Sequence, residues 1–584
     1  MKNFFFAVFF IFPFLGHSQE TPYEKSGRTL TATWEEAITH YKSLETAWPG
    51  KAKLTESGTS DAGKPLHLFI ISSGGDFDPE KIKRSGKRIV LINNAIHPGE
   101  PEGVDASMML ARDLLAEPAY VSLLENVVIL IIPMYNVGGA LNRGCCYRAN
   151  QNGPTPHGFR GNSRNLDLNR DFAKSDSREA QLFNKVMTTF NPDIFIDTHT
   201  TDGSDYPYVI TVIPTQKDKA RPAIAQYMQK ILMPDLYTKM KEAGFELAPY
   251  VNTVSEFPDS GIADFFDSPR YATGYANLYN CIGITTETHM LKSFDQRVEA
   301  TYQFLLAIAK LTGRDKVQIA RARTEAGKDL DQQNAFPLHW ELNTKQHDWF
   351  LFKGYEASKK AGAVTGKEHA VYDQASPWER KIPYFNSYIP SDTVNAPVAY
   401  IIPQAWHEAI TRLQANNVKM QTLTADLELE MEVYYIDDYK TTPNAYEGHY
   451  LHYEIKTRTE KQKIWFHKGD VVIYLNQPAK RYLVEMLEPR AEDSYFAWNF
   501  FDEILMQKEY FSTWLFEDKA AEILAGDPAL KARFEEQKTK DADFAANGRK
   551  QLDFIYKNSP WYEKSHLRYP VGRLLKEQKM SLSK

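Results

Sequence analysis

The fold is decided by the stretch Asn93-Asn94-Ala95-Ile96-His97-Pro98-Gly99-Glu100. It follows an apolar run at 88–92, which predicts a buried strand, and it precedes residues 103–115, whose pattern predicts a helix. His97 and Glu100 are therefore expected in the turn at the end of a strand, where ligands collect in open α/β sheets. An imidazole and a carboxylate three residues apart can bind one metal ion, and both are common zinc ligands. Taken alone, the pair is equally consistent with two solvated loop residues.

Apolar runs elsewhere in the first half of the chain predict the other strands of this sheet, at 67–71, 127–133, 193–199, 208–213 and 282–287. Helical patterns separate them: one begins at the capping box of Thr33 and Glu36, and others cover about 176–191 and 295–311. Strands that alternate with helices predict an α/β fold with a mixed, mostly parallel sheet flanked by helices.

A chain of 584 residues is long enough for two or more domains. We expect a signal peptide at 1–18, the α/β domain at 19–315, a β-rich accessory domain at 316–490 and a helical C-terminal segment at 491–584 that packs on the preceding domains. The strict alternation of apolar and polar residues at 426–433 supports the β-rich part, and Asp527-Pro528 predicts a break between helices.

The N-terminus has the pattern of a secretory signal, with Lys2, an apolar core at 4–15 and small residues before Gln19. The apolar core is too short to span a bilayer comfortably, so cleavage and a secreted or periplasmic location are expected. No later stretch has the length of a spanning helix, which predicts no stable membrane insertion.

Charge and cysteine content exclude several classes of protein. The net charge of −6 and the pI near 6.2 show no basic excess, so nucleic acid is not an expected partner. Three cysteines, Cys145, Cys146 and Cys281, do not form a disulfide framework. A pair between Cys281 and one vicinal cysteine is one alternative, free buried thiols are favoured, and a thiolate metal site is disfavoured.

Two polar stretches later in the chain could complete a site around His97 and Glu100. His199 ends a predicted strand between Asp197 and Asp202, although a single histidine of this kind is more often a core residue. A close pair with a distant third ligand is the usual plan of a catalytic zinc site. The loop 160–172 carries three arginines, and Asn169-Arg170 beside a metal would bind a carboxylate bidentately, unless the loop is only a solvated face.

The ordered set of motifs resembles the zinc metallocarboxypeptidases of the carboxypeptidase A type. The set comprises His97-Pro98-Gly99-Glu100, Asp167-Leu168-Asn169-Arg170, His199 and Glu287, and the resemblance covers roughly residues 23–314. Asn136-Val137-Gly138-Gly139 also resembles the family's Asn-Pro-Asp-Gly turn, with two differences. The resemblance implies a carboxypeptidase-like α/β/α fold, one zinc ion per chain and a peptide or protein substrate with a free C-terminus.

The resemblance also implies a role for each matching residue around the metal. The expected zinc ligands are His97, Glu100 and His199, and Asp167 is expected to accept a hydrogen bond from His97. Glu287 is expected to be the general base and then the general acid, with Glu102 as the first alternative.

Substrate binding is implied at three further places. Asn169 and Arg170 would bind the terminal carboxylate of the peptide. Arg160 matches best the arginine that polarises the scissile carbonyl, with Arg148 and Arg164 as alternatives. Either Tyr271 or Tyr275 would close over the substrate, and spacing does not choose between them. Gly99 stands where the digestive members carry arginine, so the chain departs from the family at this substrate contact.

Two other classes of function stay open at this point. One is a different zinc hydrolase on the same scaffold, either an amidohydrolase that deacylates N-acyl amino acids or a cell-wall peptide hydrolase. The other is a non-catalytic binding protein, which would be expected to have lost a ligand or the base. Asn169-Arg170 favours peptides with a free C-terminus, although a cell-wall peptide also has one.

Overall fold

The computed structural model describes residues 19–583, so the predicted signal segment 1–18 lies outside the described residues. The chain forms two compact units. The first comprises 19–333, 340–391 and 415–417, and the second comprises 334–339, 392–414 and 418–583. Each unit is described by itself.

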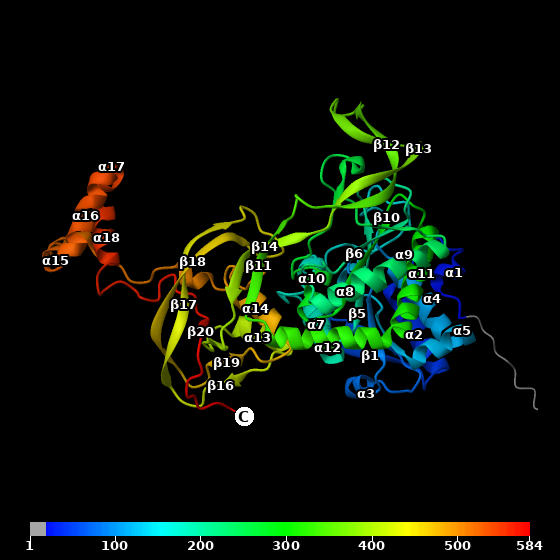
Figure 1. The fold of residues 1–584 in the computed structure, drawn as a ribbon, viewed down its shortest axis with the longest axis horizontal. Helices are drawn as coiled ribbons and strands as arrows, with labels where there is room; N and C mark the ends of the chain where they lie inside the picture. The colour runs from blue at the N-terminus through cyan, green and yellow to red at the C-terminus, as the bar shows by residue number, and fades with distance from the viewer. Residues whose placement is uncertain (1–18, 584) are drawn as a thin grey trace, which may run out of the picture. The chain divides into compact units, whose positions relative to one another are not determined.

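An eight-stranded mixed sheet forms the centre of the first unit (Figure 1). Its strands, in spatial order, are β1 (Ala52–Thr59), β2 (Pro65–Ile71), β4 (Val127–Ile132), β3 (Arg88–Asn93), β5 (Ile194–Thr201), β10 (Ile282–His289), β6 (Ile210–Pro214) and β7 (Leu247–Pro249). The four central strands β4, β3, β5 and β10 are parallel, as are β6 and β7. The other neighbouring pairs are antiparallel, which confirms the mixed α/β sheet predicted from the sequence.

Helices cover both faces of this sheet. They are α1 (Pro22–Lys25), α2 (Trp34–Ala47), α3 (Pro79–Arg84), α4 (Glu102–Ala116), α5 (Pro118–Val121), α6 (Val137–Leu141), α7 (Arg178–Phe190), α8 (Pro222–Tyr227), α9 (Met233–Glu242), α10 (Ala272–Leu278), α11 (Phe294–Arg314) and α12 (Lys316–Gln332). Helix α2 begins at the capping box expected at Thr33 and Glu36. The Asn191-Pro192 break ends α7, with Asn191 in the left-handed region.

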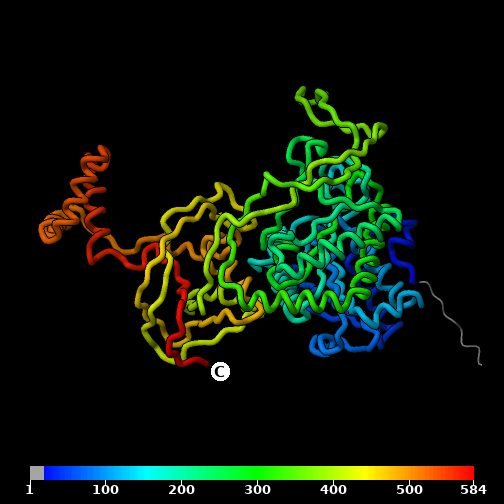
Figure 2. Tube along the Cα trace, viewed as in Figure 1, coloured from blue at the N-terminus to red at the C-terminus, as the bar shows by residue number. Residues whose placement is uncertain are grey.

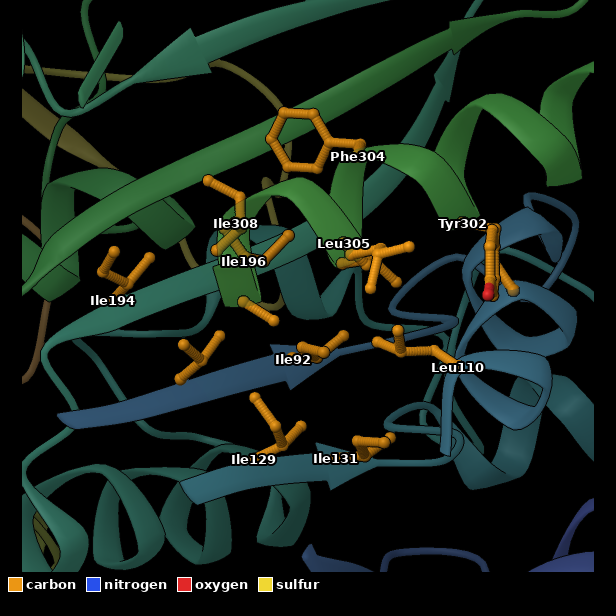
Figure 3. Packing of buried hydrophobic residues seen from close by; sticks show 14 of the residues in the cluster. Ile92, Leu110, Ile129, Ile131, Ile194, Ile196, Tyr302, Phe304, Leu305 and Ile308 are labelled. Atoms are coloured by element: carbon orange, nitrogen blue, oxygen red, sulfur yellow. The ribbon is translucent and has the colours of Figure 1, made fainter. Parts of the chain in front are cut away.

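The sheet is apolar on both faces because its central strands are covered on both sides. On one face Ile92, Ile131 and Ile196 pack with Leu110 of α4 and Leu305 of α11 (Figure 3). On the other face an aromatic cluster joins the sheet to α7 and α10; its rings belong to Phe172, Phe183, Phe195 and Tyr275. These two cores fix the parallel strands whose ends carry the polar residues of interest.

Helix α4 approaches strand β5 closely just after Glu100. A Cβ atom at Gly103 would lie 2.0 Å from Thr198 Oγ1, so only glycine allows this approach. Gly103 thereby holds the start of α4 against the strand that carries His199.

A long β-hairpin also belongs to the first unit (Figure 2). Its strands β12 (Asp348–Ala361) and β13 (Glu368–Phe385) form a four-stranded sheet with β9 (Ile262–Ala263) and β8 (Asn252–Thr253). Tyr384 of β13 pairs with Ile262 of β9, and α12 groups with the same unit. The first compact unit therefore includes α12 and this hairpin, and the expected domain boundary at residue 315 stays a prediction.

The second unit contains a six-stranded antiparallel sheet and a set of helices. The strands, in spatial order, are β16 (Gln421–Thr422), β19 (Val471–Tyr474), β15 (Ala399–Ile402), β20 (Gly572–Leu574), β17 (Leu427–Thr441) and β18 (His452–Phe466). The helices are α13 (His407–Ala415), α14 (Lys480–Leu487), α15 (Thr513–Gly526), α16 (Pro528–Lys540), α17 (Ala542–Ala546) and α18 (Gly548–Lys557). A separate two-stranded sheet pairs β11 (Ala335–Leu342) with β14 (Tyr388–Asn395). Helices α15 to α18 share a small core of Phe516, Phe534, Phe544 and Tyr556.

Two of the three cysteines differ from the expectation of free buried thiols. Cys145 and Cys146 form a vicinal disulfide in an exposed loop, whereas Cys281 is buried and free. The expectation failed because spacing says nothing about whether adjacent cysteines face solvent or the core. Within residues 19–583 no helix is both long and apolar enough to cross a membrane.

Candidate active site

Three adjacent parallel strands deliver the polar residues to one edge of the sheet. The loop after β3 carries His97 and Glu100, β5 carries His199, and β10 carries Glu287. Glu287 is the register partner of His199 across the β5–β10 pair. Carboxyl ends of neighbouring parallel strands meet at the same edge, so residues about 100 and 190 positions apart become neighbours.

His97, Glu100 and His199 form a buried cluster of possible metal ligands. One ligand atom from each lies within 4.8 Å of the others, and the three residues are between 2 % and 4 % exposed. His97 Nδ1 lies 3.3 Å from Glu100 Oε1, and His199 Nδ1 lies 3.3 Å from Glu100 Oε2. Both rings therefore turn their Nδ1 atoms toward the same carboxylate.

The opposite nitrogen of each ring contacts a second carboxylate. His97 Nε2 lies 2.9 Å from Asp167 Oδ1, and His199 Nε2 lies 2.9 Å from Asp197 Oδ2. Asp197 in turn accepts a hydrogen bond of 2.9 Å from Asn93 Nδ2. A carboxylate at Nε2 keeps the proton there, which leaves the lone pair of Nδ1 for a metal. Asp197 was not among the residues expected from the sequence, although it lies two positions before His199 and hence on the same face of the strand.

The donor set fits zinc. Two imidazole nitrogens and one carboxylate are the ligands of many catalytic zinc sites, and a fourth position stays open for water or substrate. The carboxylates at both Nε2 atoms supply the outer contacts that such histidines usually have. His97, Glu100 and His199 are therefore the residues that would hold one zinc ion.

A network of buried hydrogen bonds holds Glu100 in place. Thr200 N–H donates to Glu100 Oε2 at 2.9 Å, and Thr200 Oγ1 donates to Glu102 Oε2 at 2.7 Å. Glu102 Oε1 also accepts from Arg297, which is fully buried and donates to four main-chain carbonyls. Glu102 is thus held inside the protein, and this position does not suit the alternative role of general base.

A pocket of about 410 Å³ opens beside the cluster and collects most of the remaining expected residues. Its lining includes Arg148, Arg160, Asn169, Arg170, Tyr271 and Glu287. Glu287 is partly buried, and burial raises the pKa of its carboxyl to about 8 against the opposing charge of His199. The positive charge of a bound zinc ion would act in the opposite direction, lowering this pKa and favouring the carboxylate.

Two of the three candidate arginines reach the pocket. Arg148 is 16 % exposed, donates to Glu100 Oε1 and donates to the Thr200 carbonyl at 2.8 Å. Arg160 is 47 % exposed and donates twice to Asp167 Oδ2, at 3.1 and 2.9 Å. Arg164 does not line the pocket and instead donates to the Asp176 carbonyl at 2.8 Å. Both arginines contact the ligand cluster: Arg148 Nη1 lies 2.5 Å from Glu100 Oε1, and Arg160 Nη1 lies 3.5 Å from the same oxygen. Arg148, ranked below Arg160 on sequence, is thus the more buried of the two and makes the shorter contact.

The two candidate tyrosines occupy different environments. Tyr271 lines the pocket, and its ring lies 4.5 Å from the guanidinium carbon of Arg170. Tyr275 is fully buried in the aromatic cluster against α7, and its hydroxyl donates to Asn416 Oδ1 at 2.7 Å. The structure therefore corrects the expectation for Tyr275, because a core side chain cannot close over a substrate, and it favours Tyr271.

Asp267 is a pocket residue that the sequence did not single out. It is 5 % exposed, and its carboxylate accepts a hydrogen bond from Thr273 Oγ1. Burial raises the pKa of Asp267 to about 6. An acidic group is therefore present in the wall of the pocket, near Ala272 and Thr285.

The surroundings of Gly99 explain why no arginine stands between His97 and Glu100. A Cβ atom there would lie 3.0 Å from Arg148 Cδ and 3.2 Å from the Gly158 carbonyl oxygen. Arg148 and the 157–158 loop thus fill the space that a side chain would need. A smaller pocket of about 280 Å³, lined by Tyr147 and Phe159 among others, adjoins the cluster at this point.

The chain is similar to several known proteins. Residues 38–234 match the family Peptidase_M14, described as zinc carboxypeptidase. Carboxypeptidase 2 of Trichophyton rubrum is 22 % identical over 451 residues, which is 75 % of this chain and 78 % of the relative. Carboxypeptidase 2 of Trichophyton equinum is 21 % identical over 429 residues, or 70 % and 73 % of the two chains. The crystal structure of carboxypeptidase A from Helicoverpa armigera has 16 % identity and a TM-score of 0.36, covering 51 % of this chain and 75 % of that chain.

Proposed function

Because this chain carries a zinc carboxypeptidase domain of the Peptidase_M14 family and is a metallocarboxypeptidase hydrolase, we propose that it releases single residues from the free C-terminus of peptides. One observation carries the proposal. A single pocket contains the metal cluster, the carboxylate of Glu287 and the carboxylate-binding pair Asn169 and Arg170. An exopeptidase needs these three functions side by side, because the terminal carboxylate lies one residue from the bond that is cut.

Zinc, when bound, supplies Lewis acidity and makes water acidic enough to lose a proton near pH 7. The protein's own residues do the rest. Glu287 takes the proton of the attacking water and then gives it to the nitrogen of the leaving amine. A guanidinium at the rim of the cluster donates to the carbonyl oxygen as negative charge develops there. Arg170 and Asn169 hold the terminal carboxylate, and Tyr271 lies beside them as the cover of the pocket.

The arginine that stabilises the oxyanion is tested by comparing Arg148→Ala with Arg160→Ala. We expect Arg148→Ala to lower kcat by a factor on the order of 10²–10³, the usual effect of losing one donor to the oxyanion. Arg160→Ala should have the smaller effect on kcat, since Arg160 is half-exposed and held by Asp167. Steady-state kinetics with one peptide measure both values of kcat. A larger loss of kcat in Arg160→Ala than in Arg148→Ala would favour Arg160 as the oxyanion-stabilising arginine, as expected from the sequence.

Asp267 leads to a proposal about the substrate. A buried carboxylate in the pocket wall favours a C-terminal side chain that carries a positive charge, because buried charges are stabilised by pairing. We expect the wild type to prefer lysine or arginine over leucine at the C-terminus, and Asp267→Asn to reduce this preference by roughly tenfold or more. The matched control is Asp202→Asn, which changes a more exposed carboxylate of the same pocket. An unchanged ratio of kcat/KM values in Asp267→Asn would contradict this role.

The proposal as a whole is tested by following the digestion of a peptide by mass spectrometry. Loss of one residue at a time from the C-terminus supports it, whereas internal fragments or release of an acyl group would support one of the other hydrolase classes. We further propose that the protein is exported, on the basis of the signal-like sequence at 1–18.

A further inference from the structure

A second cavity of about 410 Å³ lies in the first unit. It is bounded by strands β6 and β7, by the helical segment before and within α9, and by the residues at the base of the β12–β13 hairpin. None of the metal-cluster residues or of the substrate-binding residues lines it. The cavity therefore needs an explanation other than peptide hydrolysis.

The polar groups in this cavity leave an acceptor available. Tyr384 O–H donates to Asp264 Oδ1 at 2.6 Å, and Tyr388 O–H donates to the Asp264 carbonyl at 2.9 Å. Among residues 19–583, Asp264 Oδ2 and the Tyr237 hydroxyl have no hydrogen-bond partner. Burial raises the pKa of Asp264 to about 7 against the opposing charge of Lys217, so a cationic partner would stabilise its ionised form.

Part of the wall is apolar. Val212, Met228, Met233 and Phe350 line it, and methionines adapt their shape to different ligands. Met228 also begins a π-helical turn, Met228–Leu232, between α8 and α9. Such turns are rare and occur frequently at functional sites, which is an independent reason to expect a ligand here.

We propose that this cavity binds a small molecule that carries an ammonium group on an apolar body. The ammonium group would meet Asp264 and the Tyr237 hydroxyl, and the body would pack on Met228, Met233 and Phe350. Two sources share this chemistry. One is a simple amine; the other is a free amino acid, whose carboxylate would meet Lys217, a further lining residue that donates to Asn386 Oδ1 at 3.2 Å.

The cavity and the active-site pocket lie on opposite sides of one layer of chain. Val212, Pro249 and Asp264 line the cavity, while the next residue in each case, Ile213, Tyr250 or Phe265, lines the active-site pocket. Successive side chains of extended chain point to opposite sides, so three separate segments form a wall one residue thick. A ligand in the cavity should therefore alter peptide binding on the other side; this consequence rests on the proposed function, whereas binding itself does not.

Isothermal titration calorimetry of the full chain with 2-phenylethylamine tests the proposal. This probe has the ammonium group but no carboxylate, so it cannot use Arg170. We expect stoichiometric binding, weakened at least about tenfold in Asp264→Asn, which keeps an acceptor for Tyr384. The matched control, Asp348→Asn, removes an exposed carboxylate at the same cavity and should bind as the wild type does. 3-Phenylpropionate, which has the same body and the opposite charge, should not bind Arg170→Ala, in which the proposed carboxylate site of the active-site pocket is removed.

A second titration separates the two sources of ligand. L-Phenylalanine is titrated into Arg170→Ala, so that the proposed carboxylate site of the active-site pocket does not contribute. If L-phenylalanine binds this variant more tightly than 2-phenylethylamine does, and if adding Lys217→Met to the variant abolishes that difference, the cavity is an amino acid site. If the two compounds bind equally, it is an amine site.

Two results would overturn the proposal: no heat with either probe at millimolar concentration, or equal affinity of wild type and Asp264→Asn. Should Asp264→Asn fail to fold, Tyr237→Phe replaces it and should weaken binding. If 2-phenylethylamine binds but the KM for peptide does not change, the binding site is supported and only the proposed effect on the active site is rejected.

Discussion

Glu287→Gln is expected to lower turnover by a factor on the order of 10²–10⁴ or more while zinc content stays the same. Glutamine keeps the shape of the side chain on β10 but can neither accept the proton of the attacking water nor return it to the leaving amine. Glu287 lies outside the ligand set His97, Glu100 and His199, so its replacement leaves the metal cluster intact. Single-turnover kinetics and elemental analysis of the same preparation measure both quantities.

The control for this variant is Asp202→Asn, another carboxylate of the same pocket, which should retain most of the activity. Near-normal turnover in Glu287→Gln would move the base elsewhere. Glu102 is a poor substitute, because Arg297 and Thr200 occupy both of its carboxylate oxygens.

Amidation of the peptide C-terminus is expected to reduce kcat/KM by about 30-fold to several thousand-fold. An amidated peptide offers no carboxylate to Arg170, and losing one partner of a desolvated charge pair costs roughly 2–5 kcal/mol. Each 1.36 kcal/mol corresponds to a factor of ten in rate. Arg170→Ala should lose most of the discrimination between the free acid and the amide.

Arg164→Ala is the matched control, since Arg164 belongs to the same loop but lies outside the pocket. It should discriminate as the wild type does. Equal rates on the two peptides with the wild type would remove the carboxylate site and point to an endopeptidase or an amidase.

Helices and strands of the first unit were predictable where a local sequence pattern determines where they lie. The capping box at Thr33 starts α2, Asn191-Pro192 ends α7, and apolar runs give β3, β4, β5 and β10. The family resemblance of the motifs implied the ligand set His97, Glu100 and His199, and the parallel strands bring these residues together at one edge of the sheet.

Features that depend on long-range packing were not predictable. Arg148 and Arg160 lie in irregular loops, where spacing does not decide which side chain turns toward Glu100. Tyr271 and Tyr275 are one helical turn apart, and only the aromatic core on α7 distinguishes them. The pairing of Tyr384 with Ile262 joins segments more than 100 residues apart, so the hairpin could not be assigned to the first unit.

The most direct test of the proposed function combines zinc analysis with C-terminal ladder sequencing of one peptide. The wild type is predicted to bind one zinc per chain, to lose activity with a chelator, to regain it with one equivalent of zinc, and to shorten the peptide from its C-terminus one residue at a time. His199→Ala, which removes one of the three ligands, should lose both stoichiometric zinc and the ladder. Retention of wild-type zinc affinity by His199→Ala, or a ladder that persists without zinc, would contradict it.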